Sequence, residues 1–224
     1  LLLLCMPIRR GIISTIFGKI EPRLLDYGST YFVYILLSLP FLAAYNSGAA
    51  LFRSMGNSRV SLYISVVMNI LNIGGNAFFI FVMKMGVAGA GLSTLISRII
   101  GSILVLGLLR NPRNRITIRS YNIFRIKGWM IRKILFVGIP TGVEGSLFQV
   151  GKLLVQGFIA SFGTASLAAN AIAGSVSTFI NIPGGAISMA SVTVIGQTIG
   201  ARRTDLSVFY AKRLLLFAYI AMFI

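Results

Sequence analysis

Residues 87–110 of the chain have the sequence VAGAGLSTLISRIIGSILVLGLLR, and this stretch decides the class of fold. Between Val87 and Leu109 the only charged residue is Arg98, and the run ends at Arg110, where a basic segment begins. At about 1.5 Å per residue, a helix of this length crosses a hydrocarbon core of roughly 30 Å. The stretch is therefore typical of a transmembrane helix.

The composition of the whole chain agrees with a membrane protein. Of its 224 residues, 56% are hydrophobic and 11% are charged, whereas about a quarter of the residues are charged in soluble domains. The mean hydropathy is +0.88. Further complete spans are expected at 30–52, 60–83, 134–162 and 165–199, with partial spans at both ends. The predicted fold class is all-α, a polytopic transmembrane helical bundle.

Both ends of the chain are expected to be cut inside transmembrane helices. The opening LLLLCMP at 1–7 has no preceding basic region and too few apolar residues for a signal peptide or a span. The run at 214–224 is about half as long as a span needs to be. One cysteine and no histidine exclude a disulfide framework and a His or Cys zinc site. Cys5 is interpreted as an apolar filler, and no metal site is predicted.

The basic residues indicate the orientation of the chain. The formal charge of +17 would suggest a nucleic-acid partner in a soluble protein. Here the basic residues lie in short connections between apolar runs, so no nucleic-acid partner is expected. The connections at 53–59, 110–133 and 200–213 hold 14 of the 21 Lys and Arg residues, against five on the opposite side. By the positive-inside rule, these connections face the cytoplasm of a multi-pass protein in the cell membrane.

The longest connection divides the chain into parts. The segment 110–133 contains Pro112, eight basic residues and Trp129, and it is predicted to be a solvated cytoplasmic linker ending in an interfacial helix. Residues 1–109 are then part of an N-terminal helical bundle, and residues 134–224 are part of a C-terminal one.

Charged residues inside the spans are the first candidates for function. A charged group at the centre of a transmembrane helix costs roughly 2.5 to 3.5 kcal/mol on insertion scales, so it tends to line a cavity or find a partner. Three residues meet this description: Arg98, Glu144 and Lys152. Glu144 is the only acid in a complete span and lies near mid-membrane. One interpretation gives Glu144 a structural role, in which it is neutral or paired with a base. The other gives it a role in the transport pathway. A pairing with Arg98, expected at similar depth, is a hypothesis.

Polar side chains also recur with helical spacing. Residues at i, i+3 and i+7 share one face of a helix. Two stripes have this spacing: Gln149, Lys152 and Gln156 in one span, and Asn69, Asn72 and Asn76 in another. Amide stripes either hold transmembrane helices together, at about 0.6 kcal/mol per hydrogen bond, or form the wall of a wet cavity. Both interpretations stay open.

Prolines and small residues predict how the helices bend and pack. Kinks are expected at Pro40, Pro140 and Pro183, and such kinks can provide hinges for alternating access. The small residues in GVAGAGLSTLISR at 86–98 and SLAANAIAGSVS at 166–177 permit close contacts between helices.

The chain resembles the MATE family of multidrug and toxic compound extrusion transporters. Four stretches carry the resemblance: FRSMGNSRVSLYISVVMNILNIGGNAFFIF, MGVAGAGLSTLISR, GIPTGVEGSLFQVGKLLVQGFIASFGTASLAANAIAG and IPGGAISMASVTVIGQTIGARR. The resemblance implies a protein of twelve helices in two bundles of six, of which this chain would run from the end of the third to the start of the ninth. It also implies that the linker at 110–133 joins the two bundles on the cytoplasmic side.

The resemblance implies a function as well. Family members export cationic, amphipathic small molecules in exchange for protons or sodium ions by alternating access. No cofactor is implied beyond the coupling ion. Membrane lipid surrounds the protein and is its expected partner. In some members an embedded carboxylate of the seventh helix contributes to cation binding, and Glu144 lies in the corresponding helix. The candidates for binding substrate or coupling ion are Glu144, Gln149, Lys152, Gln156, Asn69, Asn72, Asn76 and Arg98.

Two other transport or membrane functions and an enzyme are alternatives to antiport. A flippase of the same superfamily would move a lipid-linked anionic substrate through a cationic cavity, which Arg98 and Lys152 favour slightly. A structural membrane subunit without transport activity is a further alternative, because a fold by itself does not establish transport. An enzyme would need paired carboxylates, a nucleophile with a base, or metal ligands, and a single embedded acid without histidine does not supply them. No catalytic residue is predicted.

Overall fold

The apolar runs of the sequence form long helices. The computed structural model describes residues 22–112, 114, 116–117 and 128–223, so Cys5, the first partial span and part of the basic linker lie outside the described residues. Within the described part, six helices are long and apolar enough to cross a membrane. The expectation of an all-α, multi-pass membrane protein is confirmed. The chain divides into two compact units, Leu1–Arg119 and Ser120–Ile224.

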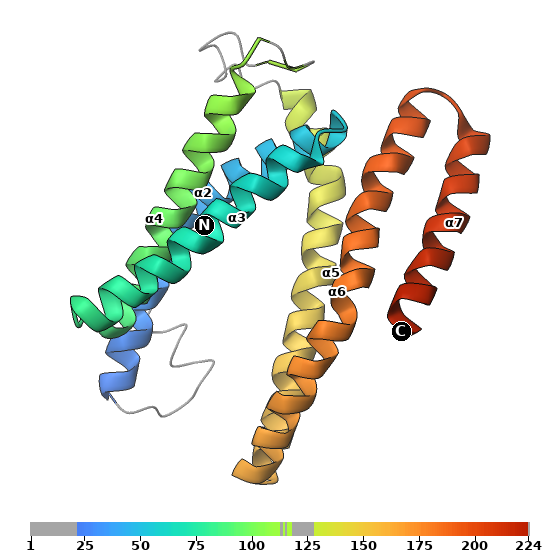
Figure 1. Cartoon of the computed structure of the whole chain (residues 1–224). Helices are drawn as coiled ribbons and strands as arrows, with labels where there is room; N and C mark the ends of the chain where they lie inside the picture. The colour runs from blue at the N-terminus through green and yellow to red at the C-terminus, as the bar shows by residue number, and fades with distance from the viewer. Residues whose placement is uncertain (1–21, 113, 115, 118–127, 224) are drawn as a thin grey trace. The chain divides into compact units, whose positions relative to one another are not determined.

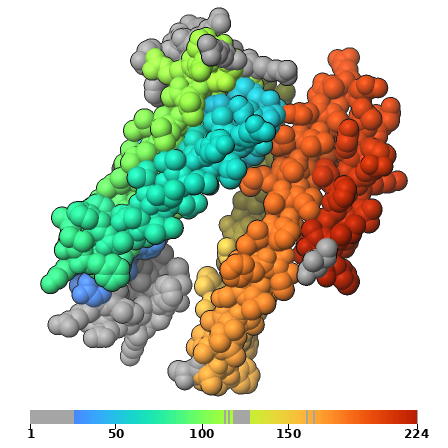
Figure 2. All heavy atoms as spheres, in the orientation of Figure 1, coloured from blue at the N-terminus to red at the C-terminus, as the bar shows by residue number. Residues whose placement is uncertain are grey.

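The first unit is built around helix α4. It contains α2 (Pro22–Ser54), α3 (Ser58–Ala77), the short π-helix η1 (Phe78–Val82) and α4 (Gly86–Leu109). Helix α4 packs against both α2 and α3, and α2 has its most extensive contacts with α4 (Figure 1). In the space-filling view, the atoms of α3 and α4 form one continuous body (Figure 2). This packing places residues of α2 and of α3 next to α4.

The core of the first unit lies where α2 and α4 end and α3 begins. Phe52, Ile64, Val105 and Leu109 form it, and each is nearly fully buried. A Cβ atom built on Gly48 would lie 2.9 Å from both γ-carbons of Val105. Lipid tails are as apolar as these side chains, so helices in a membrane associate through close packing rather than through the hydrophobic effect. The absence of a side chain at Gly48 permits that close packing.

The small residues of α4 make the close contacts that the sequence predicts. A Cβ atom on Gly91 would lie 2.8 Å from the Tyr34 ring of α2, and one on Gly101 would overlap Met68 of α3. The second predicted stretch behaves differently within the described residues, because Gly174 of α6 has no such neighbour within 4 Å. Small residues thus mark a tight interface on α4 and open surface at Gly174.

The described part of the second unit contains three successive helices: α5 (Gly128–Ser161), α6 (Thr164–Gly200) and α7 (Thr204–Phe223). The chain reverses between α5 and α6 at Gly163, whose φ of +97° lies in a region that glycine adopts without steric cost. Helices α6 and α7 are side by side (Figure 1). Every described residue from Gly128 to Phe158 is exposed. The other described helices of this unit therefore leave almost all of the surface of α5 uncovered.

Two element boundaries differ from the sequence-based expectation. Helix α5 begins at Gly128, so Trp129 lies in its first turn and not in a separate interfacial helix. Helix α7 begins at Thr204 and is 20 residues long, whereas the sequence predicted a loop to residue 213 and a half-length span after it. Lysine and arginine are good helix formers, and their long side chains can reach polar surroundings from inside a span. Lys212 and Arg213 therefore do not delay the start of the helix.

Candidate functional site

Asn72 is the centre of a polar cluster between α3 and α4. Its Nδ2 atom donates to the hydroxyls of Thr94, at 3.2 Å, and Ser97, at 3.5 Å. Its backbone carbonyl accepts a hydrogen bond of 2.9 Å from the Ser93 hydroxyl. The side-chain oxygen accepts one of 3.3 Å from Nδ2 of Asn76. Asn72 thus connects three hydroxyl residues of α4 to α3.

The three asparagines of the predicted stripe have different surroundings. Asn72 and Asn76 belong to the cluster between the helices, but Asn69 is exposed. The Oδ1 atom of Asn76 is buried without a hydrogen-bond partner. Gly75, the residue before Asn76, permits α3 and α4 to lie close together here, because a Cβ atom on residue 75 would overlap the hydroxyl of Ser93. The hydrogen bonds of Asn72 join α3 to α4. They correspond to the first interpretation of an amide stripe, in which it holds helices together.

Arg98 faces the other neighbour of α4. Its Nη1 atom donates a hydrogen bond of 2.5 Å to the hydroxyl of Ser38 on α2. Ser38 is fully buried and donates in turn to the carbonyl of Ile35, at 2.6 Å. Pro40, two residues later, lies inside α2. The predicted pairing of Arg98 with Glu144 would join the two units and stays a prediction.

The four candidates of the second unit all lie on α5 and are all exposed. Glu144 occupies the middle of this helix, 16 residues after Gly128 and 17 before Ser161. Gln149, Lys152 and Gln156 follow on the C-terminal half. The structure thus places these polar side chains on one long helix whose surface is open within the unit.

Lys152 stacks on an aromatic ring of its own helix. Its ammonium lies 5.2 Å from the centre of the Phe148 ring, one turn toward the N-terminus. Two further pairs have the same spacing: Lys133 lies 5.0 Å from the Trp129 ring, and Arg213 lies 4.6 Å from the Phe209 ring. Helical side chains lean toward the N-terminus, so each cation lies nearer to that end than its own Cα atom.

The position of Lys152 along its helix differs from the positions of Lys133 and Arg213. Lys133 and Arg213 lie in the first halves of α5 and α7, so their charges lean toward the nearer helix end. Lys152 is nine residues from Ser161, the end of α5, and its charge leans toward the middle of the helix. Lysines facing lipid extend toward the nearer interface. The charge of Lys152 instead points toward the middle of α5.

Several residues of these clusters were not singled out from the sequence. They are Ser38, Ser93, Thr94, Ser97 and Phe148. The hydroxyl residues in GLSTLIS at 91–97 were a usable signal, because buried hydroxyls in membranes bond across helices. Among the described residues, no group of three or more acidic or cysteine side chains is arranged to hold a metal ion.

Comparison with known proteins identifies relatives of the chain. The MatE family model matches residues 1–78 and 140–224. An uncharacterized transporter of Bacillus subtilis, YisQ, is 31% identical over 179 residues, which cover 78% of this chain and 39% of that protein. A probable multidrug resistance protein of Thermotoga maritima, NorM, is 26% identical over 205 residues, covering 84% of this chain and 41% of that protein. The chain thus spans about two fifths of the length of these relatives.

A solved structure has the same fold. A crystal structure of a MATE protein in the bent conformation superposes with a TM-score of 0.85 at 18% identity, covering 98% of this chain and 49% of that one. The similarity extends over both units of the chain.

Proposed function

Because this chain belongs to the MatE family, we propose that it is part of an efflux transporter that exports small cationic, amphipathic molecules in exchange for protons or sodium ions. The family consists of transporters and not of enzymes, in agreement with the sequence analysis. The NorM relative of Thermotoga maritima is named as a probable multidrug resistance protein, which supports export of small molecules.

The position of Glu144 carries the proposal. At about 1.5 Å per residue, its Cα atom lies roughly 24 Å from either end of α5. A glutamate side chain is too short to reach an interface from there. A carboxylate at such depth needs water, a proton or a cation beside it, because a bare charge is costly in hydrocarbon. Glu144 therefore has the chemistry of a coupling site.

Lys152 and the two glutamines support a hydrated cavity beside this carboxylate. Two turns of helix separate Lys152 from Glu144, and the ammonium leans back toward Glu144 over the Phe148 ring. Gln149 and Gln156 add amide donors and acceptors on the same side as Lys152. The acid, the amides and the aromatic ring of this wall suit an amphipathic cation, which needs both apolar contact and a counter-charge, whereas the ammonium of Lys152 favours an anion.

Transport would follow from competition at Glu144. The ionised carboxylate binds either a cationic substrate or the coupling ion, since two positive charges at one site in low dielectric repel each other. Substrate binds from the cytoplasmic side, and arrival of a proton or sodium ion from outside releases it. Helix α5 contains Pro140 and α6 contains Pro183, and these positions can serve as hinges for alternating access.

Substitution of Glu144 tests the proposal. Glu144→Gln keeps the size of the side chain but removes its charge, so we expect at least a tenfold loss of cation-driven efflux from proteoliposomes of the full-length transporter. Glu144→Asp should retain more activity than Glu144→Gln. The matched control is Asp205→Asn, which removes an acid from the first turn of α7 and should leave efflux unchanged. Wild-type rates and ion dependence in Glu144→Gln would refute the coupling role.

A flippase for a lipid-linked anion is the second candidate, and Arg98 favours it. The hydrogen-bond partner of this permanently charged group is the neutral Ser38 hydroxyl, which leaves its charge available to an anion. In that case Arg98→Gln should stop translocation of the anionic lipid, and Glu144→Gln should have little effect. A larger loss of transport in Glu144→Gln than in Arg98→Gln would instead support cation antiport.

A further inference from the structure

The turn between α6 and α7 and the first half of α7 form a basic surface. Arg202 and Arg203 lie in the turn, and Lys212 and Arg213 lie on α7. All four side chains are exposed, and in the described part of the chain no carboxylate forms an ion pair with them. The nearest acid in the sequence is Asp205, which accepts a hydrogen bond of 3.3 Å from the Thr204 hydroxyl. We call these four basic residues the hairpin cluster.

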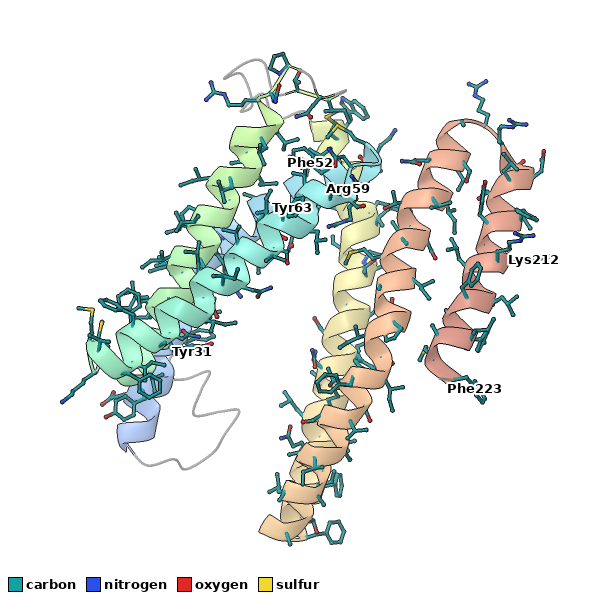
Figure 3. All side chains as sticks on the ribbon, viewed as in Figure 1. Tyr31, Phe52, Arg59, Tyr63, Lys212 and Phe223 are labelled. Carbon is teal, nitrogen blue, oxygen red and sulfur yellow. The ribbon has the colours of Figure 1, made fainter. Side chains whose placement is uncertain are left out.

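The basic residues of α7 face away from α6. The side of α7 that packs on α6 carries Ser207, which is buried, and Ala211, Leu214 and Ala218, which are half-buried. These residues follow the i, i+4, i+7 and i+11 spacing of one helix face. Lys212 lies off that face, and Figure 3 shows it pointing away from α6. The α7 part of the cluster is therefore on the open side of the helical hairpin.

The Arg213 side chain of α7 brings its charge toward the turn. Arg213 is nine residues from Thr204, roughly 13 Å along the axis. Its guanidinium lies over the Phe209 ring, about one turn nearer to the start of the helix. The charge of Arg213 is thus drawn toward the level of Arg202 and Arg203. The positive-inside prediction places this level at the cytoplasmic interface.

The turn retains an arginine where the backbone favours glycine. Arg202 has a φ of +57°, in the left-handed region that side-chain-bearing residues rarely adopt. This conformation ends α6, with the Arg203 amide donating to the Thr198 carbonyl at 3.0 Å. The Arg202 side chain therefore stands at a backbone position that glycine adopts more readily.

We propose that the hairpin cluster binds the phosphate-bearing headgroup of an anionic phospholipid in the cytoplasmic leaflet. Clusters of four or more basic residues beside a transmembrane helix attract anionic lipids. The guanidinium of Arg213 supplies paired donors for phosphate oxygens. The exposed Phe209 ring and Leu216 side chain on the same open side of α7 contact the upper acyl chain. Charge and depth together favour a lipid over a soluble anion.

Lipid retention by the full-length transporter tests this site. The purified protein is mixed with equimolar phosphatidylglycerol and phosphatidylcholine, and bound lipids are counted by native mass spectrometry. We expect the wild type to prefer phosphatidylglycerol. The preference of the double variant Lys212→Gln/Arg213→Gln should fall by roughly 25-fold, because each basic residue near an anionic surface contributes about a fivefold factor.

Two further variants separate a specific site from general charge. Lys84→Gln removes a positive charge from an exposed position before α4 and should retain the wild-type preference. Lys212→Arg/Arg213→Lys keeps both charges and should retain most of it. If the double Gln variant is not monodisperse, the single variants replace it, each with an expected loss of about fivefold.

Two results overturn the proposal. One is equal phosphatidylglycerol preference in the double Gln variant and the wild type. The other is displacement of the lipid by inorganic phosphate at matched concentration, which would identify a site for soluble anions. Neither result depends on transport, so the proposed function and this site fail independently.

Discussion

Arg98 on α4 donates a hydrogen bond to Ser38 on α2, with 2.5 Å between Nη1 and Oγ. Ser38 lies two residues before Pro40 in α2. Proline has no amide hydrogen, so the carbonyl of Leu36, four residues earlier, lacks its usual helical hydrogen bond. A charged donor thus connects α4 to α2 beside a break in the hydrogen bonding of α2. The contact joins the two helices close to Pro40.

Ser38→Ala should therefore destabilise the first unit. A hydrogen bond to a charged group contributes about 1.5 to 3 kcal/mol, so we expect a loss within that range. The matched control is Ser47→Ala at an exposed position of the same helix, with an expected effect near zero. Thermal unfolding of the full-length transporter in detergent measures both. Equal melting temperatures for the two variants would show that the Arg98 contact contributes nothing.

Asn72→Ala should be more harmful than Asn69→Ala. Asn72 makes three side-chain hydrogen bonds, and at about 0.6 kcal/mol each in a membrane their loss amounts to roughly 2 kcal/mol. Asn69 is exposed and should be replaceable without loss of stability. Thermal unfolding again provides the measurement. A larger effect at Asn69 than at Asn72 would contradict this ranking.

Adjacent glycines of α3 should respond in opposite directions to alanine. A Cβ atom at Gly75 would overlap the Ser93 hydroxyl, whereas one at Gly74 meets nothing within 4 Å. Gly75→Ala should cost about 1 to 3 kcal/mol through overpacking. Gly74→Ala should be neutral or should stabilise by up to about 1 kcal/mol, because alanine favours helix. Denaturation of the two variants under identical conditions compares them, and equal stability would exclude the tight contact.

Cysteine labelling checks the orientation. In a full-length background without native cysteines, a cysteine at Asn114 should be protected from an impermeant thiol reagent in intact cells, because the basic connection at 110–133 is predicted to be cytoplasmic. A cysteine at the exposed Lys84, on the opposite side, should react. Reversal of these reactivities would invert the topology and move the proposed lipid site to the outer leaflet.

The sequence predicted the spans well where apolar runs end abruptly. The run at 87–109 differs by one residue from α4, Gly86–Leu109, because Lys84 and Arg110 bound it closely. The start of α7 was predicted too late, because Lys212 and Arg213 were assigned to a loop. A charge count cannot distinguish a basic loop from a helix whose basic side chains lean toward the interface. That distinction depends on the backbone.

Hydropathy and charge by themselves determined that the chain is an all-α membrane protein and which residues share a helix face. They did not determine which neighbour each face meets. Asn69 and Asn72 belong to one stripe, yet Asn72 is bonded to α4 and Asn69 is exposed. Periodicity gives angles about a single helix axis, about 100° per residue, whereas burial depends on where the next helix lies. Only the tertiary structure decided that Asn72 contacts Thr94 and that Arg98 contacts Ser38, because these contacts join residues 22 and 60 positions apart.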